Sequence, residues 1–129
     1  MATIKSYTDL EQSKKLAEIL SLESADYFHA PDAGIVVTEP YKLNEDDETV
    51  ITTYKGAIPC WSLAALLNVL PRFIEFKGDK YYLRFMKEYV EYANDGVSLI
   101  GSCLHTTGNN NLVDACHEMI IKLNELNLL

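Results

Sequence analysis

Residues 58–71, IPCWSLAALLNVLP, form a fourteen-residue stretch without a charged side chain. The stretch is shorter than the about 20 apolar residues that span a bilayer. Such a segment must be buried on nearly every side, so we expect the rest of the chain to fold around it. We expect it to be a central core helix, with Pro59 in the first turn and Pro71 ending it. This pattern constrains the architecture and leaves the chemistry open.

The length and composition are those of an ordinary soluble domain. The 129 residues are 48% hydrophobic and 23% charged, so we expect one domain over residues 1–129. The opening, MATIKSYTDLEQSKKL, lacks a basic region followed by an apolar run, and we therefore expect no secretory signal. Cys60, Cys103 and Cys116 do not have the spacing of a disulfide framework. Reduced thiols favour a cytoplasmic location.

The net charge of −8 limits the classes of partner. An acidic surface repels phosphate groups, so we expect no direct binding to nucleic acid or to a membrane. The densest acidic run, Glu45-Asp46-Asp47-Glu48, is most simply a solvated loop. The alternative is that these four residues contact a basic surface on a protein partner.

The first half of the chain predicts one helix followed by strands. Thr8 and Glu11 have the spacing of a capping box, which predicts a helix that ends near Leu20. The tetrapeptide Pro31–Gly34 is typical of a turn and predicts a hairpin. The strands expected here are at about 26–30, 35–39 and 49–54.

The second half predicts strands and a final helix. Gly78-Asp79 and Asp95-Gly96 are turn signals between strand-like runs. Residues 81–93 also have aromatic side chains at helical spacing, but the flanking turns favour strands. Asparagines 109–111 predict a cap for a helix over about 112–127. The fold class is therefore α+β, with an antiparallel sheet packed against about three helices.

Cysteine and histidine residues near the C-terminus raise the question of a metal site. Cys103, His105, Cys116 and His117 are the donor types that zinc prefers. Their spacing differs from the two close ligand pairs of structural zinc sites, and adjacent residues on a helix point about 100° apart. We therefore expect no metal and no cofactor, and interpret the cysteines as core residues.

A Cys–His or carboxylate enzyme is the alternative function. Cys60 is the best nucleophile candidate, because the N-terminus of the expected helix would lower the pKa of its thiol. The imidazole bases available to it are His29, His105 and His117. No nucleophile elbow, phosphate-binding loop or oxyanion motif surrounds these residues, so we identify no catalytic residue.

The chain has eight tyrosines, more than its core should need. Alternate positions of a strand cannot all face one core, so we expect some of these side chains to be exposed. Exposed tyrosines are common in protein-binding surfaces. We select Tyr82 and Tyr92 as candidate interaction residues, and a purely structural role for the tyrosines is the alternative.

Three segments carry a family resemblance: TDLEQSKKLAEIL, IPCWSLAALLNVLPR and LVDACHEMIIKLNELNLL. The chain resembles a family of small proteins carried by prophages and other mobile elements of gut anaerobic bacteria, which share the patterns tLeqSkkLaeiLp, iPaWSLsaLLellP and LvDAcvemIikLhel. It departs from them in an acidic insert at about 39–50 and in Ser21, where they have proline. The resemblance implies a cytoplasmic accessory protein of mobile DNA and brings no established activity.

These observations together predict a non-enzymatic protein that binds another protein. The acidity, the surplus of tyrosine and the absence of a catalytic motif all favour this function. A homodimer is a further option. The small enzyme described above remains the alternative.

Overall fold

The computed structural model describes residues 5–38, 41–43, 49–52, 56–86, 88–94, 102–106 and 109–129. The chain forms two compact units, which we name by their order in the sequence. The N-terminal unit is Thr8–Ser62. The C-terminal unit joins Met1–Tyr7 to Leu63–Leu129.

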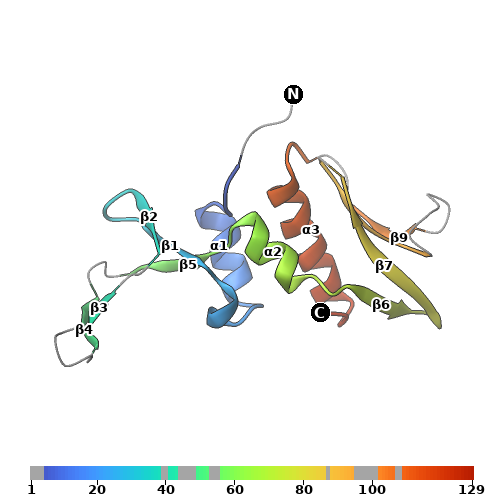
Figure 1. Ribbon diagram of the computed structural model, residues 1–129, viewed down its shortest axis with the longest axis horizontal. Coiled ribbons are helices and arrows are strands. Elements are labelled where there is room, and N and C mark those ends of the chain that lie inside the picture. The colour runs from blue at the N-terminus through green and yellow to red at the C-terminus, as the bar shows by residue number, and fades with distance from the viewer. Residues whose placement is uncertain are drawn as a thin grey trace. The chain divides into compact units, whose positions relative to one another are not determined.

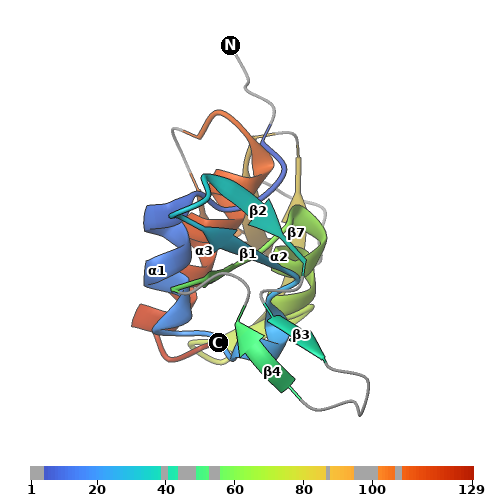
Figure 2. The same ribbon diagram turned by 90° about the vertical axis from the view of Figure 1, so that its left-hand side faces the viewer.

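The described residues of the N-terminal unit form a helix, a short 3₁₀ helix and five strands. Strands β1, β2 and β5 form an antiparallel sheet in the order β2-β1-β5, and β3 pairs with β4 in a separate hairpin. Figure 2 shows β1 and β2 side by side, apart from β3 and β4. The bounds are α1 Leu10–Ala17, η1 Leu22–Ser24, β1 Tyr27–Ala30, β2 Ile35–Val37, β3 Tyr41–Leu43, β4 Thr49–Thr52 and β5 Ile58–Cys60.

The predicted first helix is present, but its cap differs from the prediction. Asp9 is the N-cap: its carboxylate accepts from the Gln12 backbone N–H at 2.8 Å, and the Gln12 side chain accepts from the Asp9 N–H at 3.1 Å. Thr8 is instead buried, with its hydroxyl 2.8 Å from that of Ser13. The capping box therefore starts one residue later than the sequence pattern indicated. Thr8 is not the cap, because its side chain is buried and contacts Ser13.

The uncharged segment 58–71 is half strand and half helix, and the prediction of a continuous helix is wrong. Pro59 lies in strand β5 and not in a first turn. Among the described strands, β5 pairs only with β1 and is therefore an edge strand, and an edge position tolerates a residue without an N–H. Helix α2 begins at Leu63, directly after Ser62, whose backbone N–H donates to the Asp26 carboxylate at 2.9 Å. Pro71 follows the helix, as predicted.

Trp61 is completely buried, as predicted, and it connects several segments of the N-terminal unit. Its backbone N–H donates to the Thr8 hydroxyl at 3.1 Å, and its carbonyl accepts from the Thr8 N–H at 2.9 Å. Its indole N–H donates to the Ser24 hydroxyl at 2.9 Å. The core of this unit is therefore fixed by hydrogen bonds as well as by apolar packing.

The described residues of the C-terminal unit form two helices and a four-stranded antiparallel sheet in the order β6-β7-β8-β9. Helix α3 packs against β8 and against α2 (Figure 1). The buried residues come from both helices and from the sheet, among them Leu66, Ile74, Val90 and Met119. The bounds are α2 Leu63–Val69, β6 Phe73–Phe76, β7 Asp79–Phe85, β8 Val90–Ala93, β9 Ser102–His105 and α3 Leu112–Glu125.

The predicted β6–β7 hairpin is present, with its turn shifted by one residue. Phe76 pairs with Asp79, so the two turn residues are Lys77 and Gly78. Both have positive φ, 52° and 88°, as a type I′ turn requires. Residues 81–85 and 90–93 are strands, which confirms the choice of strand over helix. β8 and β9 pair antiparallel as predicted, while Asp95-Gly96 lies outside the described residues.

Helix α3 is capped as the sequence predicts. The Asn111 side chain accepts from the Asp114 N–H at 2.9 Å. Asp114 also pairs with the ammonium of Lys5 at 2.7 Å, which ties the start of the chain to this helix. Glu118 and Lys122 form an i, i+4 ion pair at 3.1 Å. The apolar side chains of Cys116, Met119 and Leu123 on this helix are buried, whereas Leu126, directly after it, is exposed.

The α+β fold class with antiparallel strands is confirmed. The described strands form three sheets where one was expected. The single-domain organisation stays a prediction. No helix within the described ranges has the length and apolar character needed to cross a membrane.

Candidate functional site

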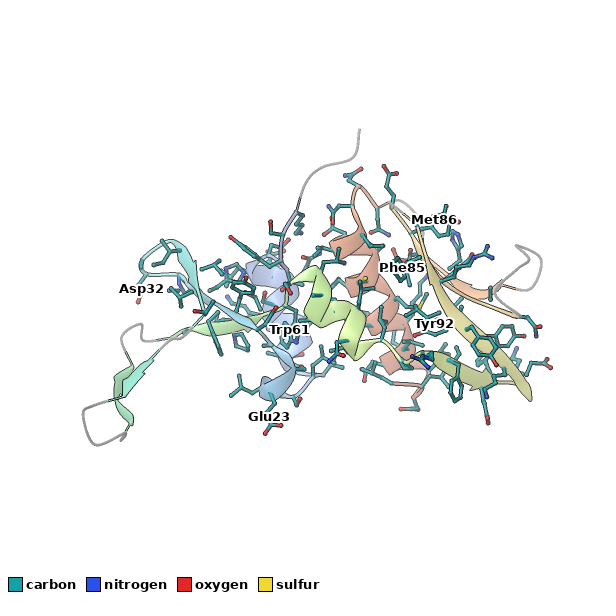
Figure 3. All side chains as sticks on the ribbon, viewed as in Figure 1. Glu23, Asp32, Trp61, Phe85, Met86 and Tyr92 are labelled. Carbon is teal, nitrogen blue, oxygen red and sulfur yellow. The ribbon has the colours of Figure 1, made fainter. Side chains whose placement is uncertain are left out.

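The four-stranded sheet has one face toward α3 and one face away from it. Tyr92 and Phe85 lie on the α3 side in Figure 3. Because side chains alternate along a strand, their neighbours Glu91 and Arg84 belong to the opposite face. We name this the outer face. Its cross-strand rows are Phe73–Tyr82–Ala93 and Arg84–Glu91–His105, with Glu75 opposite Lys80.

The outer face contains a buried carboxylate between two basic groups. Glu91 is 0% exposed, and its Oε1 lies 2.7 Å from Nη2 of Arg84. Its Oε2 lies 3.8 Å from Nε2 of His105 on the other neighbouring strand. No described group donates a well-aligned hydrogen bond to either oxygen. Ion pairing with Arg84 is therefore the main compensation for the lost hydration of this carboxylate.

His105 is the accessible end of this charged row. Its side chain is 41% exposed, and its ring stacks on Tyr89 with the centroids 4.8 Å apart and the planes at 27°. Its backbone carbonyl accepts from the Lys122 ammonium at 2.7 Å. An exposed imidazole backed by a buried carboxylate has the elements of a general base.

Beside the charged row is an exposed group of two aromatic rings and an ammonium, Phe73, Tyr82 and Lys80, which we name the aromatic–lysine patch. Phe73 is 42% exposed and Tyr82 is 39% exposed. Their centroids are 6.2 Å apart, with the planes tilted by 52°. The Lys80 Nζ lies 4.0 Å from the Phe73 centroid and 5.9 Å from that of Tyr82. The patch offers apolar area and positive charge together.

The two tyrosines selected from the sequence have opposite environments. Tyr82 is exposed in the aromatic–lysine patch, as an interaction residue must be. Tyr92 is completely buried, and its hydroxyl donates to the Pro71 carbonyl at 2.7 Å. Burial, and secondly the nearby Cys116, raise the pKa of the Tyr92 phenol well above its usual range. Tyr92 is therefore a core residue, which removes it from the candidate interaction residues.

The predicted acidic contact surface, Glu45-Asp46-Asp47-Glu48, lies outside the described residues. Its contact with a basic partner therefore stays a prediction.

The environment of Cys60 is opposite to the one predicted. The residue lies in β5, not at a helix N-terminus, and its side chain has no exposed surface. Burial, and secondly the negative charge of Asp26, raise the pKa of the thiol to about 12. A thiol with this pKa is protonated at neutral pH, so it lacks the thiolate that a cysteine nucleophile needs.

The cysteines and histidines considered for zinc are divided between two elements, β9 and α3. His105 belongs to β9, whereas Cys116 lies buried on α3, where burial raises the pKa of its thiol to about 12. Cys103 also belongs to β9. In the part of the chain that the structure describes, no three histidine, cysteine, aspartate or glutamate side chains are grouped as metal ligands.

Sequence reasoning selected Tyr82 but missed Phe73, Lys80, Arg84 and Glu91. The signal for Glu91 was present, because a charged residue between Val90 and Tyr92 in a strand must face away from the side they occupy. Its burial and its pairing with Arg84 depend on register, which the sequence does not give.

Comparison with protein-family models, with curated proteins and with solved structures returned no match. The surfaces of the chain itself therefore carry the functional inference.

Proposed function

We propose that this protein is a non-enzymatic, cytoplasmic accessory protein of a prophage or mobile element, and that it binds another protein through the aromatic–lysine patch. The observation that carries the proposal is the exposure of Phe73 and Tyr82 as neighbours on one face of the sheet. Aromatic side chains in a rigid element are frequent binding hot spots, because they bury a large area at a small entropic cost. The accessory role rests on the family resemblance.

The strand framework supports a binding role for these two side chains. Phe73 and Tyr82 are directly opposed in the β6–β7 ladder, so their spacing does not depend on a loop. A surface held in this way loses little conformational freedom when a partner binds.

The test is capture of a partner from a lysate of the native host by the immobilised protein. The double variant Phe73→Ala/Tyr82→Ala should lose at least about nine-tenths of the captured partner, since losing two hot spots costs over 2 kcal/mol. Phe85→Ala is the matched control, because Phe85 is an exposed aromatic of the same strand outside the patch. Equal capture by the double variant and the wild type would overturn the proposal.

A small carboxylate-dependent enzyme is the second candidate, and the observation in its favour is the exposed His105 next to the buried Glu91. The pair could remove a proton from a bound water or hydroxyl. Turnover in a broad hydrolase screen that His105→Gln abolishes, and Phe73→Ala/Tyr82→Ala does not, would favour this enzyme over the binding protein.

A further inference from the structure

Strand β6 forms one edge of the four-stranded sheet. Among the described strands, β6 pairs only with β7, and no strand lies on its other side. An edge strand has a row of backbone N–H and C=O groups that can pair with another extended chain. This edge borders the aromatic–lysine patch, because Phe73 belongs to both.

The register shows which backbone groups of β6 point outward. The Leu83 N–H donates to the Arg72 carbonyl at 2.9 Å, and Phe76 closes the two-residue turn opposite Asp79. In an antiparallel pair, inward-bonded residues alternate with residues whose N–H and C=O point away from the neighbour. Residues 72, 74 and 76 therefore bond to β7, and the backbone groups of Phe73 and Glu75 point to the open edge.

The side chains of Phe73 and Glu75 lie on the outer face, in the same rows as Tyr82 and Lys80. Residues opposite one another in a sheet have their side chains on the same face. A strand added at β6 would thus place every second side chain beside the aromatic–lysine patch.

The β6–β7 hairpin has a net charge opposite in sign to that of the whole chain. Residues 72–85 contain four basic side chains and two acidic ones, Glu75 and Asp79, which gives a net charge of +2. Arg72, Lys77 and Lys80 form no ion pair with any described carboxylate. The Nζ atom of Lys77 lies 5.3 Å from the centroid of the Phe76 ring. The Nζ atom of Lys80 lies over the Phe73 ring of the aromatic–lysine patch. The net charge of the chain is −8, so these bases form a local positive region on an acidic protein. Unpaired lysines beside aromatic rings favour a partner with both carboxylates and apolar side chains.

We propose that β6 binds an extended segment of a partner protein as a fifth strand, and that the residues at every second position of this segment, which face the aromatic–lysine patch, include both apolar and acidic side chains. This inference rests on the proposed binding function and names the partner's chemistry. The outward N–H and C=O groups of Phe73 and Glu75 supply the strand hydrogen bonds. Phe73 and Tyr82 contact the apolar side chains, and Lys80 pairs with a carboxylate. Recognition of this kind is β-strand addition.

A single-stranded nucleic acid also combines negative charge with stacking groups, but the local charges fit it less well. Arg84 is committed to Glu91, so the described part of the outer face lacks the row of neighbouring cations that follows a phosphate backbone. Phosphate binding needs several cations free of carboxylates, and an overall charge of −8 opposes it.

The test measures binding of a fluorescein-labelled seven-residue peptide by fluorescence anisotropy. Positions 2, 4 and 6 of the peptide are Phe, Glu and Phe, so that these three side chains share one face of the strand, and the other positions are Thr. Glu75→Pro removes the outward N–H at this position, and an edge strand tolerates proline there. Glu75→Gln is the matched control, because it removes the same charge and keeps the N–H. We expect Glu75→Gln to bind the peptide more tightly, because it removes a carboxylate that repels the peptide's Glu, and Glu75→Pro to bind at least tenfold more weakly than Glu75→Gln.

Two further measurements complete the test. Lys80→Met should weaken binding and make it less sensitive to salt, because the ammonium is the group that pairs with the peptide. A peptide methylated on alternate backbone nitrogens should lose binding to the unchanged protein. This second measurement decides the question even if Glu75→Pro does not fold, which circular dichroism would reveal.

Three outcomes would overturn the inference. The first is no binding of the peptide up to about 1 mM. The second is equal binding by folded Glu75→Pro and Glu75→Gln. The third is binding of an oligo(dT) strand, or self-association of the protein detected by sedimentation, in place of peptide binding. Host-partner capture that depends on Phe73 and Tyr82 but survives Glu75→Pro would keep the proposed function and reject strand addition.

Discussion

The guanidinium of Arg84 lies 2.7 Å from the carboxylate of Glu91, and the carboxylate has no exposed surface whereas the guanidinium is partly exposed. The two residues are directly opposed in adjacent strands. The pair therefore joins β7 to β8 on the outer face, beside the aromatic–lysine patch. Removing one partner and removing both should have very different effects.

Arg84→Met should lower the free energy of unfolding by about 3 kcal/mol, because Glu91 then keeps a buried negative charge without its main partner. Adding Glu91→Leu to this variant should restore most of the loss. Chemical denaturation at pH 7 measures both effects. Arg72→Met is the control and should change stability by less than about 0.5 kcal/mol, since Arg72 is exposed and forms no ion pair with a described residue. A double variant as unstable as Arg84→Met would contradict this account of the pair.

Trp61→Ala should cost about 3–5 kcal/mol, because it removes a completely buried aromatic side chain and leaves a cavity. Trp61→Phe should cost less, about 1–3 kcal/mol, because it keeps a ring and loses the hydrogen bond to Ser24. Leu22→Ala is the exposed control in the same unit. Equal denaturation midpoints for Trp61→Ala and the wild type would show that Trp61 contributes nothing to the core.

The thiol of Cys60 should make stability fall at high pH. Its pKa is 9.0 when unperturbed and about 12 in the folded protein, so above pH 9 the unfolded chain loses a proton that the folded chain retains. The contribution of the protonated thiol to the free energy of unfolding is fully present below pH 9. It falls as the pH rises toward 12, by about 1 kcal/mol at pH 10. Cys60→Ala should reduce this fall, measured as the difference between unfolding free energies at pH 7 and pH 10. Parallel pH curves for the variant and the wild type would refute the prediction.

Neutralising Glu45, Asp46, Asp47 and Glu48 together should slow association with the partner and leave stability unchanged. Complementary charges mainly accelerate encounter, and salt screens them. Association rates at low and high salt, measured once a partner is identified, should differ less for the neutralised variant than for the wild type. Identical salt dependence in both would remove the acidic run from the binding mechanism.

The sequence predicted best where a local signal decides the structure. The Pro31–Gly34 turn and the Asn111 cap depend on a few neighbouring residues, and both are present. The secondary structure of segment 58–71 was harder to predict, because an apolar run without charged residues has too little periodicity to separate strand from helix. Its division at Trp61 depends on pairing with β1 and on Asp26, both distant in sequence.

The candidate site was only partly predictable for a related reason. Tyr82 and Tyr92 both lie in strands, yet one is exposed and the other is buried. Which side of a strand faces the core is set by its register with neighbouring strands and by the helix that covers it. The sequence indicated an excess of tyrosine but not the register that separates the two.

The ion pair between Lys5 and Asp114 bears on the order in which the chain folds during synthesis. The N-terminal unit is complete in sequence once Ser62 has emerged from the ribosome. Lys5 emerges before the N-terminal unit, whereas its partner Asp114 emerges more than a hundred residues later. Because contacts this distant in sequence form slowly, we expect the N-terminal unit to fold cotranslationally and the C-terminal unit to wait for α3.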